Sequence, residues 1–185
     1  MRMDAVERDG VAVVRRSSGG SAILTGPEQL IMSVVCGKGR FGSREETFDT
    51  VCGIIIDAID RLGVEAHHKP PNDVIVDGRK VSGSARRDLR DATIVHGTIV
   101  MELSDESVGR YIVPKERPSP RAYDGVGGLR EHVPGLDAKR MRWALMQSLQ
   151  ATLGMLRPAR LSERESERVE CLMEEGFGSV PSLGL

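Results

Sequence analysis

Lys80 is the residue in this chain whose type and surroundings could most directly do chemistry. It follows the dipeptide Asp77-Gly78, which is typical of a tight β-hairpin turn, and it precedes the small-residue run SGSA at residues 82–85. Small side chains on a strand allow a ligand to lie close against the backbone. A compact ammonium group beside that strand can stabilise negative charge on a phosphate or a carboxylate. The alternative interpretation is an ordinary solvated lysine after a turn.

A second stretch that could bind an anion is RRSSGG at residues 15–20. Its paired glycines allow main-chain N–H groups to turn toward an anion, and the arginine side chains are fork-shaped donors that suit phosphate. Taken alone, such a stretch usually forms only a surface turn. The run GKGRFG at residues 37–42 is predicted to be a loop between a strand and a helix rather than a phosphate loop.

These motifs, in this order, resemble those of the lipoate–protein ligase branch of the biotin/lipoate protein ligase superfamily. The resemblance is tightest over RRSSGG and over residues 72–101, where NDVIVDGRKVSGSA is followed by HGTIVM. It implies an enzyme that activates lipoate with ATP to lipoyl-AMP and passes the lipoyl group to a lysine of an acceptor domain. The implied ligands are ATP, Mg²⁺ and lipoate as substrate. Lys80 would be the catalytic residue that contacts the acyl carboxylate and the α-phosphate.

The resemblance also implies a set of substrate-binding and nucleotide-binding residues. They are Arg15, Arg16, Ser18, Gly19, Gly20, Ser21, Asn72, Asp73, Gly83, Ser84, His96, Gly97 and Thr98. Asp73 is also the candidate Mg²⁺ ligand, although Asn72-Asp73 could equally be a polar cap on a strand. His96 lies on a motif strand. It is a candidate for the lining of the site, and the alternative is a histidine without a role there.

The chain departs from the pattern of this family at several positions. The family loop reads RRxSGGGAV, then an aromatic or apolar residue, then His-Asp, whereas Ser21 replaces the third glycine and Thr25-Gly26 replace His-Asp. By this resemblance we expect the chain to lack the family's first strand–helix–strand unit and its C-terminal accessory domain, through a misassigned start, a fragment or a naturally reduced paralogue. These departures keep a second function open, that of a non-catalytic subunit or degenerate paralogue that binds lipoate or lipoyl-AMP.

A third function, octanoyl transfer through a cysteine thioester, lacks its nucleophile. The regions that carry this cysteine in octanoyltransferases of the superfamily read EAHHKPP at residues 65–71 and VPK at residues 113–115. The three cysteines, Cys36, Cys52 and Cys171, are predicted to be packed thiols. Their odd number, without metal-type spacing, favours a reducing and therefore cytoplasmic location.

Composition and charge restrict the partners. The chain has 26 Lys+Arg against 27 Asp+Glu, a net charge of -1, so no electrostatic field favours nucleic acid or a membrane. The resemblance instead implies lipoyl-acceptor domains of 2-oxoacid dehydrogenases or glycine cleavage proteins, and in some systems a small accessory ligase subunit. With 185 residues and no compositional break, we expect one lipoate-ligase-like catalytic domain over residues 1–185.

Patterning predicts the elements that position these residues. The expected fold class is α/β, a mixed β-sheet with the motif loops on one face and the three longer helices packed behind it. By the resemblance, this fold should be like a biotin/lipoate ligase catalytic domain that lacks the usual first strand–helix unit. Strands are predicted at residues 11–14, 22–24, 30–36, 74–76 and 94–101, and helices at 43–63, 106–111, 137–154 and 162–176. Residues 112–128, rich in proline and glycine, are predicted to be either a loop that becomes ordered when adenylate binds or a solvent-exposed surface connector.

Overall fold

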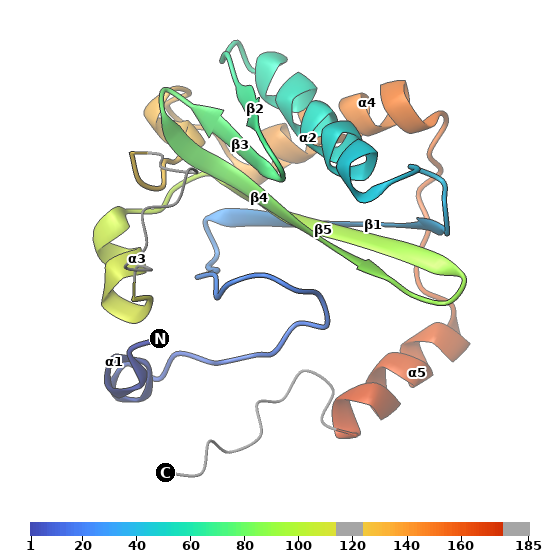
Figure 1. The fold of residues 1–185 in the computed structure, drawn as a ribbon, viewed down its shortest axis with the longest axis horizontal. Coiled ribbons are helices and arrows are strands. Elements are labelled where there is room, and N and C mark those ends of the chain that lie inside the picture. Colours follow the sequence, from blue (N-terminus) through green and yellow to red (C-terminus); the bar gives the residue numbers. More distant parts are fainter. Residues whose placement is uncertain (114–123, 176–185) are drawn as a thin grey trace.

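A five-stranded sheet with helices on one side forms the centre of the computed structural model, which describes residues 1–113 and 124–175 (Figure 1). The strand order is β1-β5-β4-β3-β2. The bounds are β1 Gln29–Gly37, β2 His67–Lys69, β3 Asp73–Val76, β4 Arg79–Asp88 and β5 Ala92–Val100. The predicted α/β class is confirmed. Neighbouring strands run antiparallel, where a mixed sheet was expected, because short turns join β3 to β4 and β4 to β5.

Two of the helices cover one face of this sheet. The helices are α1 Met3–Arg8, α2 Arg44–Asp60, α3 Asp105–Tyr111, α4 Ala138–Leu153 and α5 Glu163–Glu174, with a 3₁₀ turn, η1, at Leu129–Glu131. Figure 1 shows α2 and α4 side by side above the sheet, while the chain before β1 passes below it. The prediction that a third long helix also packs behind the sheet is wrong, because α5 has no buried residue.

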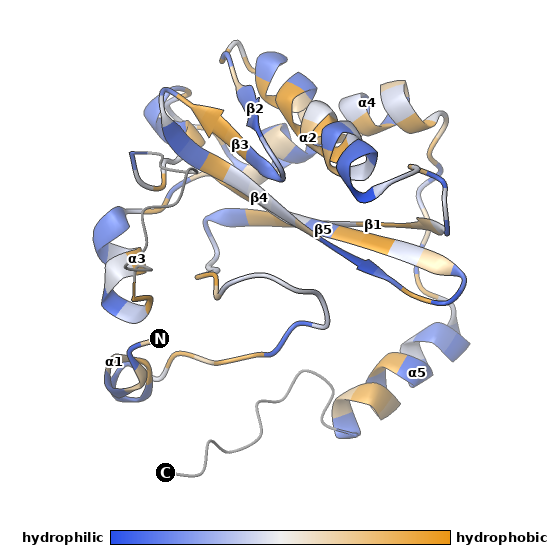
Figure 2. Cartoon of the chain, in the orientation of Figure 1, coloured by the Kyte–Doolittle hydropathy of each residue, from blue (hydrophilic) through white to orange (hydrophobic). Residues whose placement is uncertain are grey.

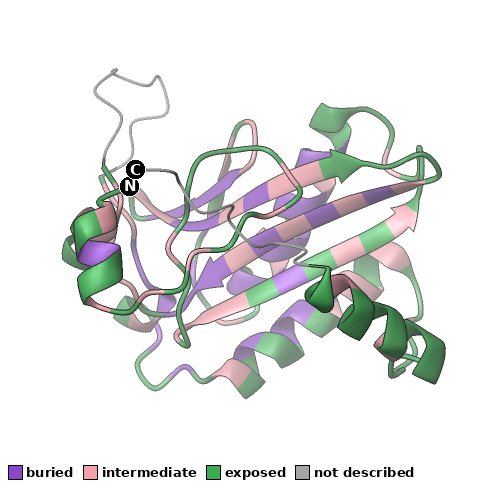
Figure 3. Cartoon of the chain, turned by 90° about the horizontal axis from the view of Figure 1, so that it is seen from below, coloured by how far each residue is buried: buried purple, intermediate pink, exposed green. Residues whose placement is uncertain are grey.

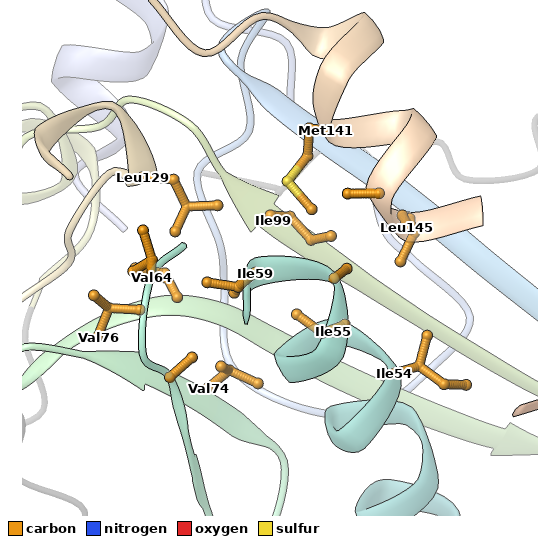
Figure 4. Close-up of a cluster of buried hydrophobic side chains, with 14 of the residues drawn as sticks. Ile54, Ile55, Ile59, Val64, Val74, Val76, Ile99, Leu129, Met141 and Leu145 are labelled. Carbon is orange, nitrogen blue, oxygen red and sulfur yellow. The ribbon is translucent and has the colours of Figure 1, made fainter. Parts of the chain in front are cut away.

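Helix α2 begins at the predicted capping box and supplies much of the core. The Ser43 hydroxyl accepts from the Glu46 amide at 3.2 Å, and the Glu46 carboxylate accepts from the Ser43 amide at 2.7 Å. Much of α2 and β3 is hydrophobic (Figure 2). Side chains from α2, the sheet and α4 point toward one another in the close-up of Figure 4, and Ile55 and Ile59 are fully buried among them. Helices α2 and α4 therefore pack against one face of the sheet and bury its core side chains.

Two predicted strands before β1 do not form. Residues 11–14 and 22–24 are half-buried or exposed and belong to no strand, although their valines and isoleucine favour β-structure. Their β-propensity does not lead to a strand, because these runs have no partner strand in the described part of the chain. Helix α1 was not predicted, and its first turn lies against α3, where the Arg2 amide donates to the Tyr111 carbonyl at 2.8 Å.

The face of the sheet opposite α2 is open along β1. On this face Ile31 and Val35 are 61% and 64% exposed (Figure 3). Strand β5 alternates between the two sides: Val95 and Ile99 belong to the core, so His96 and Thr98 face the open side. His96 and Thr98 therefore lie on the face of the sheet that α2 and α4 do not cover.

Candidate active site

Lys80 and Asp73 form an ion pair on adjacent strands. The Lys80 Nζ atom lies 2.6 Å from Asp73 Oδ1, and the two side chains are 25% and 7% exposed. A Cβ atom on Gly83 would lie 2.7 Å from Lys80 Nζ and 3.2 Å from Asp73 Oδ1. Gly83 therefore leaves the space that the ion pair fills. A lysine held in this way, half-buried and paired, is not an ordinary solvated lysine.

The pair lies on the open face of the sheet. Gly83 is directly opposite Thr98 in the β4–β5 register, and Ala85 is opposite His96. Residues that oppose each other in an antiparallel pair share one face. Lys80, Asp73, Thr98 and His96 are therefore placed on the same side, away from α2.

The RRSSGG loop reaches this face through Ser18. The Ser18 hydroxyl and His96 Nε2 share a hydrogen bond of 2.6 Å, although 78 positions separate them. Arg87 donates to the Ser17 carbonyl at 2.9 Å and holds the loop from the end of β4. Sequence reasoning missed Arg87, and its signal was the period of two that places it on the same face as Gly83 and Ala85.

Arg16 closes the loop on itself. Its guanidinium donates to the carbonyls of Gly19 and Ser21 at 3.0 and 2.8 Å. Gly20 has a φ of 113°, and a Cβ atom there would lie 2.6 Å from Arg16 Nη2, so only glycine suits this position. Arg15 is exposed beside it. In this arrangement Arg15 is the more accessible of the two arginines.

Asn72 and Ser84 join the start of β3 to β4. The Asn72 side-chain amide donates to the Ser84 carbonyl, and the Ser84 amide donates to the Asn72 carbonyl at 2.9 Å. The Ser84 side chain is buried on the helix side, and a Cβ atom on Gly97 would lie 2.8 Å from its hydroxyl oxygen. Gly97 and the Ser84 hydroxyl thus face the core, apart from the predicted site residues on the open face.

Clusters of metal ligands and the three thiols are the other candidate groups for chemistry. Among residues 1–113 and 124–175, no three His, Cys, Asp or Glu side chains gather in a way that could hold a metal ion. Burial raises the pKa of the Cys52 thiol to about 12, and the charges of Asp73 and Asp49 act in the same direction. The prediction of packed thiols is confirmed for Cys52 and wrong for Cys171, which is exposed on α5.

We predict that His96 titrates below the ordinary histidine pKa of 6.5. Burial lowers the pKa of His96, and the positive charge of Arg16 lowers it further. Because the folded pKa is below the unfolded one, the unfolded chain binds more protons between these two values. The contribution of His96 to the free energy of unfolding is therefore fully present above pH 6.5 and is lost as the pH falls from 6.5 through the folded pKa.

Titration of the His96 ring protons by NMR checks this. The Arg16→Gln variant is the matched control, and it should move the pKa of His96 upward, toward but not fully to the ordinary value, because burial remains. A pKa at or above 6.5 in the unmodified protein would contradict the prediction.

The fold is that of lipoate and biotin ligase catalytic domains. The chain belongs to the Lipoyl protein ligase A/B catalytic domain family, whose sequence model matches residues 1–150. None of the helices in the described ranges is both long and apolar enough to cross a membrane.

Solved structures agree with this assignment at the level of the fold. The bipartite lipoate protein ligase of Thermoplasma acidophilum superposes with a TM-score of 0.80 at 22% identity, over 94% of this chain and 70% of that one. A lipoate-protein ligase A bound with ATP gives 0.80 at 20% identity, over 94% and 72%. A biotin protein ligase of Aquifex aeolicus in complex with biotin gives 0.51 at 20%, over 68% and 50%.

Proposed function

We propose that this protein is a cytoplasmic lipoate–protein ligase, which uses ATP to convert lipoate to lipoyl-AMP and then transfers the lipoyl group to a lysine of an acceptor domain. The observation that carries the proposal is the half-buried Lys80 held at Gly83 on the open face. Membership of the lipoyl ligase family supports the choice of lipoate as the acyl group.

Lys80 would stabilise the negative charge where the lipoate carboxylate meets the α-phosphate. Its ammonium group is a compact cation, and a low-dielectric surrounding strengthens its attraction to an anion. Asp73 keeps the ammonium group on the open face, 2.6 Å away. When the substrates bind, the phosphate and carboxylate would become further partners of the same ammonium group.

The loop at residues 15–20 would hold the phosphate from the other side. Ser18 positions the loop over β5 through His96, and Arg16 fixes its turn. An anion could then reach Arg15 and the small Ser21, which are exposed. It could also reach the loop amides around Gly19 and Gly20. Thr98 and His96 would form the floor of the site beside them.

Mg²⁺ would be held mainly by the nucleotide phosphates. Nucleotide sites usually add only one or two protein carboxylates to such an ion, and Asp73 is the carboxylate that lies beside Lys80. The side chains beside Lys80 therefore suit a Mg²⁺ ion with Asp73 as its one protein ligand. The ion would neutralise charge on the phosphates, while Lys80 acts at the carboxylate–phosphate junction.

A lipoyl-acceptor domain would be the protein partner. One structural neighbour is described as a bi-partite ligase studied with its E2 lipoyl domain, which motivates adding a small accessory subunit to any assay. The test is mass spectrometry of purified acceptor domains, from a 2-oxoacid dehydrogenase and from a glycine cleavage protein, after incubation with the protein, lipoate and ATP. A mass increase of one lipoyl group on the acceptor lysine is expected. Binding of lipoate without any mass increase, with the accessory subunit present, would favour the non-catalytic subunit instead.

A further inference from the structure

Arg79, the residue before Lys80, is fixed by acceptors from three different parts of the chain. Its guanidinium donates to Glu131 of η1 at 2.8 Å and to Asp105 of α3 at 3.3 Å, and also to the carbonyl of Val126. Asp105 and Glu131 are carboxylates, so these bonds are charge-assisted. Two separate nitrogens of the planar guanidinium reach these acceptors, whereas a lysine would have to reach all of them from a single nitrogen.

The segment at residues 124–128 pairs with the start of β4 through the backbone of Lys80. The Lys80 amide donates to the Gly125 carbonyl at 3.0 Å, and the Gly127 amide donates to the Lys80 carbonyl at 3.0 Å. Lys80 and Val126 thus form a parallel β-bridge. Both backbone polar groups of Lys80 are bound to a segment that is distant in sequence, so the position of the lysine depends on that segment.

Asp105 and Glu131 hold the same segment from its other side. The Val126 amide donates to Asp105 at 2.7 Å, and the Gly128 amide donates to Glu131 at 3.0 Å. A Cβ atom on Gly127 would lie 2.9 Å from the Cβ of Arg79, so the glycine allows the arginine to pack directly on this backbone. Arg79, Asp105 and Glu131 therefore form a clamp on residues 124–128, which we call the Arg79 clamp.

We propose that Arg79 is a positioning residue for Lys80. The Arg79 clamp fixes residues 124–128, these residues fix the backbone of Lys80, and the backbone sets where the ammonium group lies on the open face. We do not place Arg79 itself in contact with any reacting atom. The inference rests on the proposed function only in its effect on adenylation; its effect on the Lys80 backbone is independent of what the protein catalyses.

The test compares Arg79→Met with Arg79→Lys and with the control Arg61→Met. Arg61 is another arginine with two side-chain partners, Asp57 and Ser148, but it lies on the helices behind the sheet. We expect Arg79→Met to lower kcat for lipoate-dependent adenylation by roughly ten- to a hundredfold, because a small displacement of a catalytic group is enough to do so. The KM for lipoate should change little, and Arg79→Lys should show an intermediate loss.

Two readouts separate positioning from a merely structural role. In the Lys80→Ala background, Arg79→Met should cause no further loss of adenylation, because it acts only through the lysine. Amide hydrogen exchange at Lys80 and Gly127 should be faster in Arg79→Met and unchanged in Arg61→Met.

The outcomes also separate this inference from the proposed function. If the unmodified protein forms no lipoyl-AMP with or without a small accessory subunit, the proposed function fails, and amide exchange alone tests the role of the Arg79 clamp. Unchanged exchange at both amides in Arg79→Met would overturn the inference. Losses that multiply independently in the double variant would also overturn it, because Arg79 would then act without Lys80.

Discussion

Replacing Lys80 with alanine should lower the rate of lipoate-dependent adenylation by about a hundredfold, the usual cost of removing one group that stabilises developing charge. The ammonium group lies on the open face beside Gly83 and Asp73, where we propose that it contacts the bound phosphate. The loss should appear in kcat, because the interaction is strongest when charge builds on the phosphate. The measurement is lipoate-dependent pyrophosphate release under saturating ATP.

Two further variants make this prediction specific. Lys38→Ala removes an exposed lysine from the loop after β1 and should leave the rate unchanged. Lys80→Arg keeps the charge but places a larger planar group in the space at Gly83, so it should recover only part of the rate. A Lys80→Ala protein that releases pyrophosphate at the rate of the Lys38→Ala protein would show that the lysine has no catalytic role.

Replacing Ile55 with alanine should destabilise the fold by about 2–5 kcal/mol, the range observed for such substitutions in close-packed cores. Ile55 is fully buried in the layer where α2 meets the sheet and α4. Removing its side chain loses the transfer free energy of the deleted atoms and leaves a cavity that the neighbouring helices can only partly fill. Urea denaturation followed by circular dichroism gives the difference in the free energy of unfolding.

Val35→Ala is the matched control for this second prediction. Val35 is also β-branched and apolar, but it is 64% exposed on the open face, so its loss should change stability by no more than about 0.5 kcal/mol. If the two substitutions cost the same, α2 does not pack on the sheet in the way described.

The parts of the fold that were predictable from sequence are those fixed by local chemistry. Asp77-Gly78 forms the expected turn between β3 and β4, where Asp77 has a φ of 45° and Gly78 one of 76°. The capping box at Ser43 starts α2 where its pattern placed it. In both cases the deciding interactions lie within a few residues of one another, so the sequence contains them directly.

The parts that were not predictable depend on partners far away in the chain. The apolar runs at residues 11–14 and 22–24 look like strands, yet strand formation needs a free sheet edge in register. Helix α5 has a good cap and an amphipathic pattern, but the pattern cannot say whether anything packs against it. The predicted loop at residues 112–128 lies largely outside the described residues, and its last five residues join β4 beside Lys80.

The sequence names the candidate site residues, but it does not say on which face of the sheet each of them lies. Gly83 and Gly97 are equivalent in the sequence pattern, each a glycine in a predicted strand. In the structure Gly83 makes room for the Lys80 ion pair on the open face, whereas Gly97 makes room for the Ser84 hydroxyl in the core. The side to which each position faces follows from the strand register and the bulge between β3 and β4, which no local pattern specifies.

Isotope exchange between ATP and pyrophosphate measures whether this chain forms lipoyl-AMP, because the exchange reports adenylation without any acceptor domain. We expect exchange that requires lipoate, is nearly lost in Lys80→Ala and is retained in Lys38→Ala. The assay is run with and without a small accessory subunit. Absence of lipoate-dependent exchange under both conditions, in a protein that is folded and binds lipoate, would show that the chain is not a lipoate-activating enzyme.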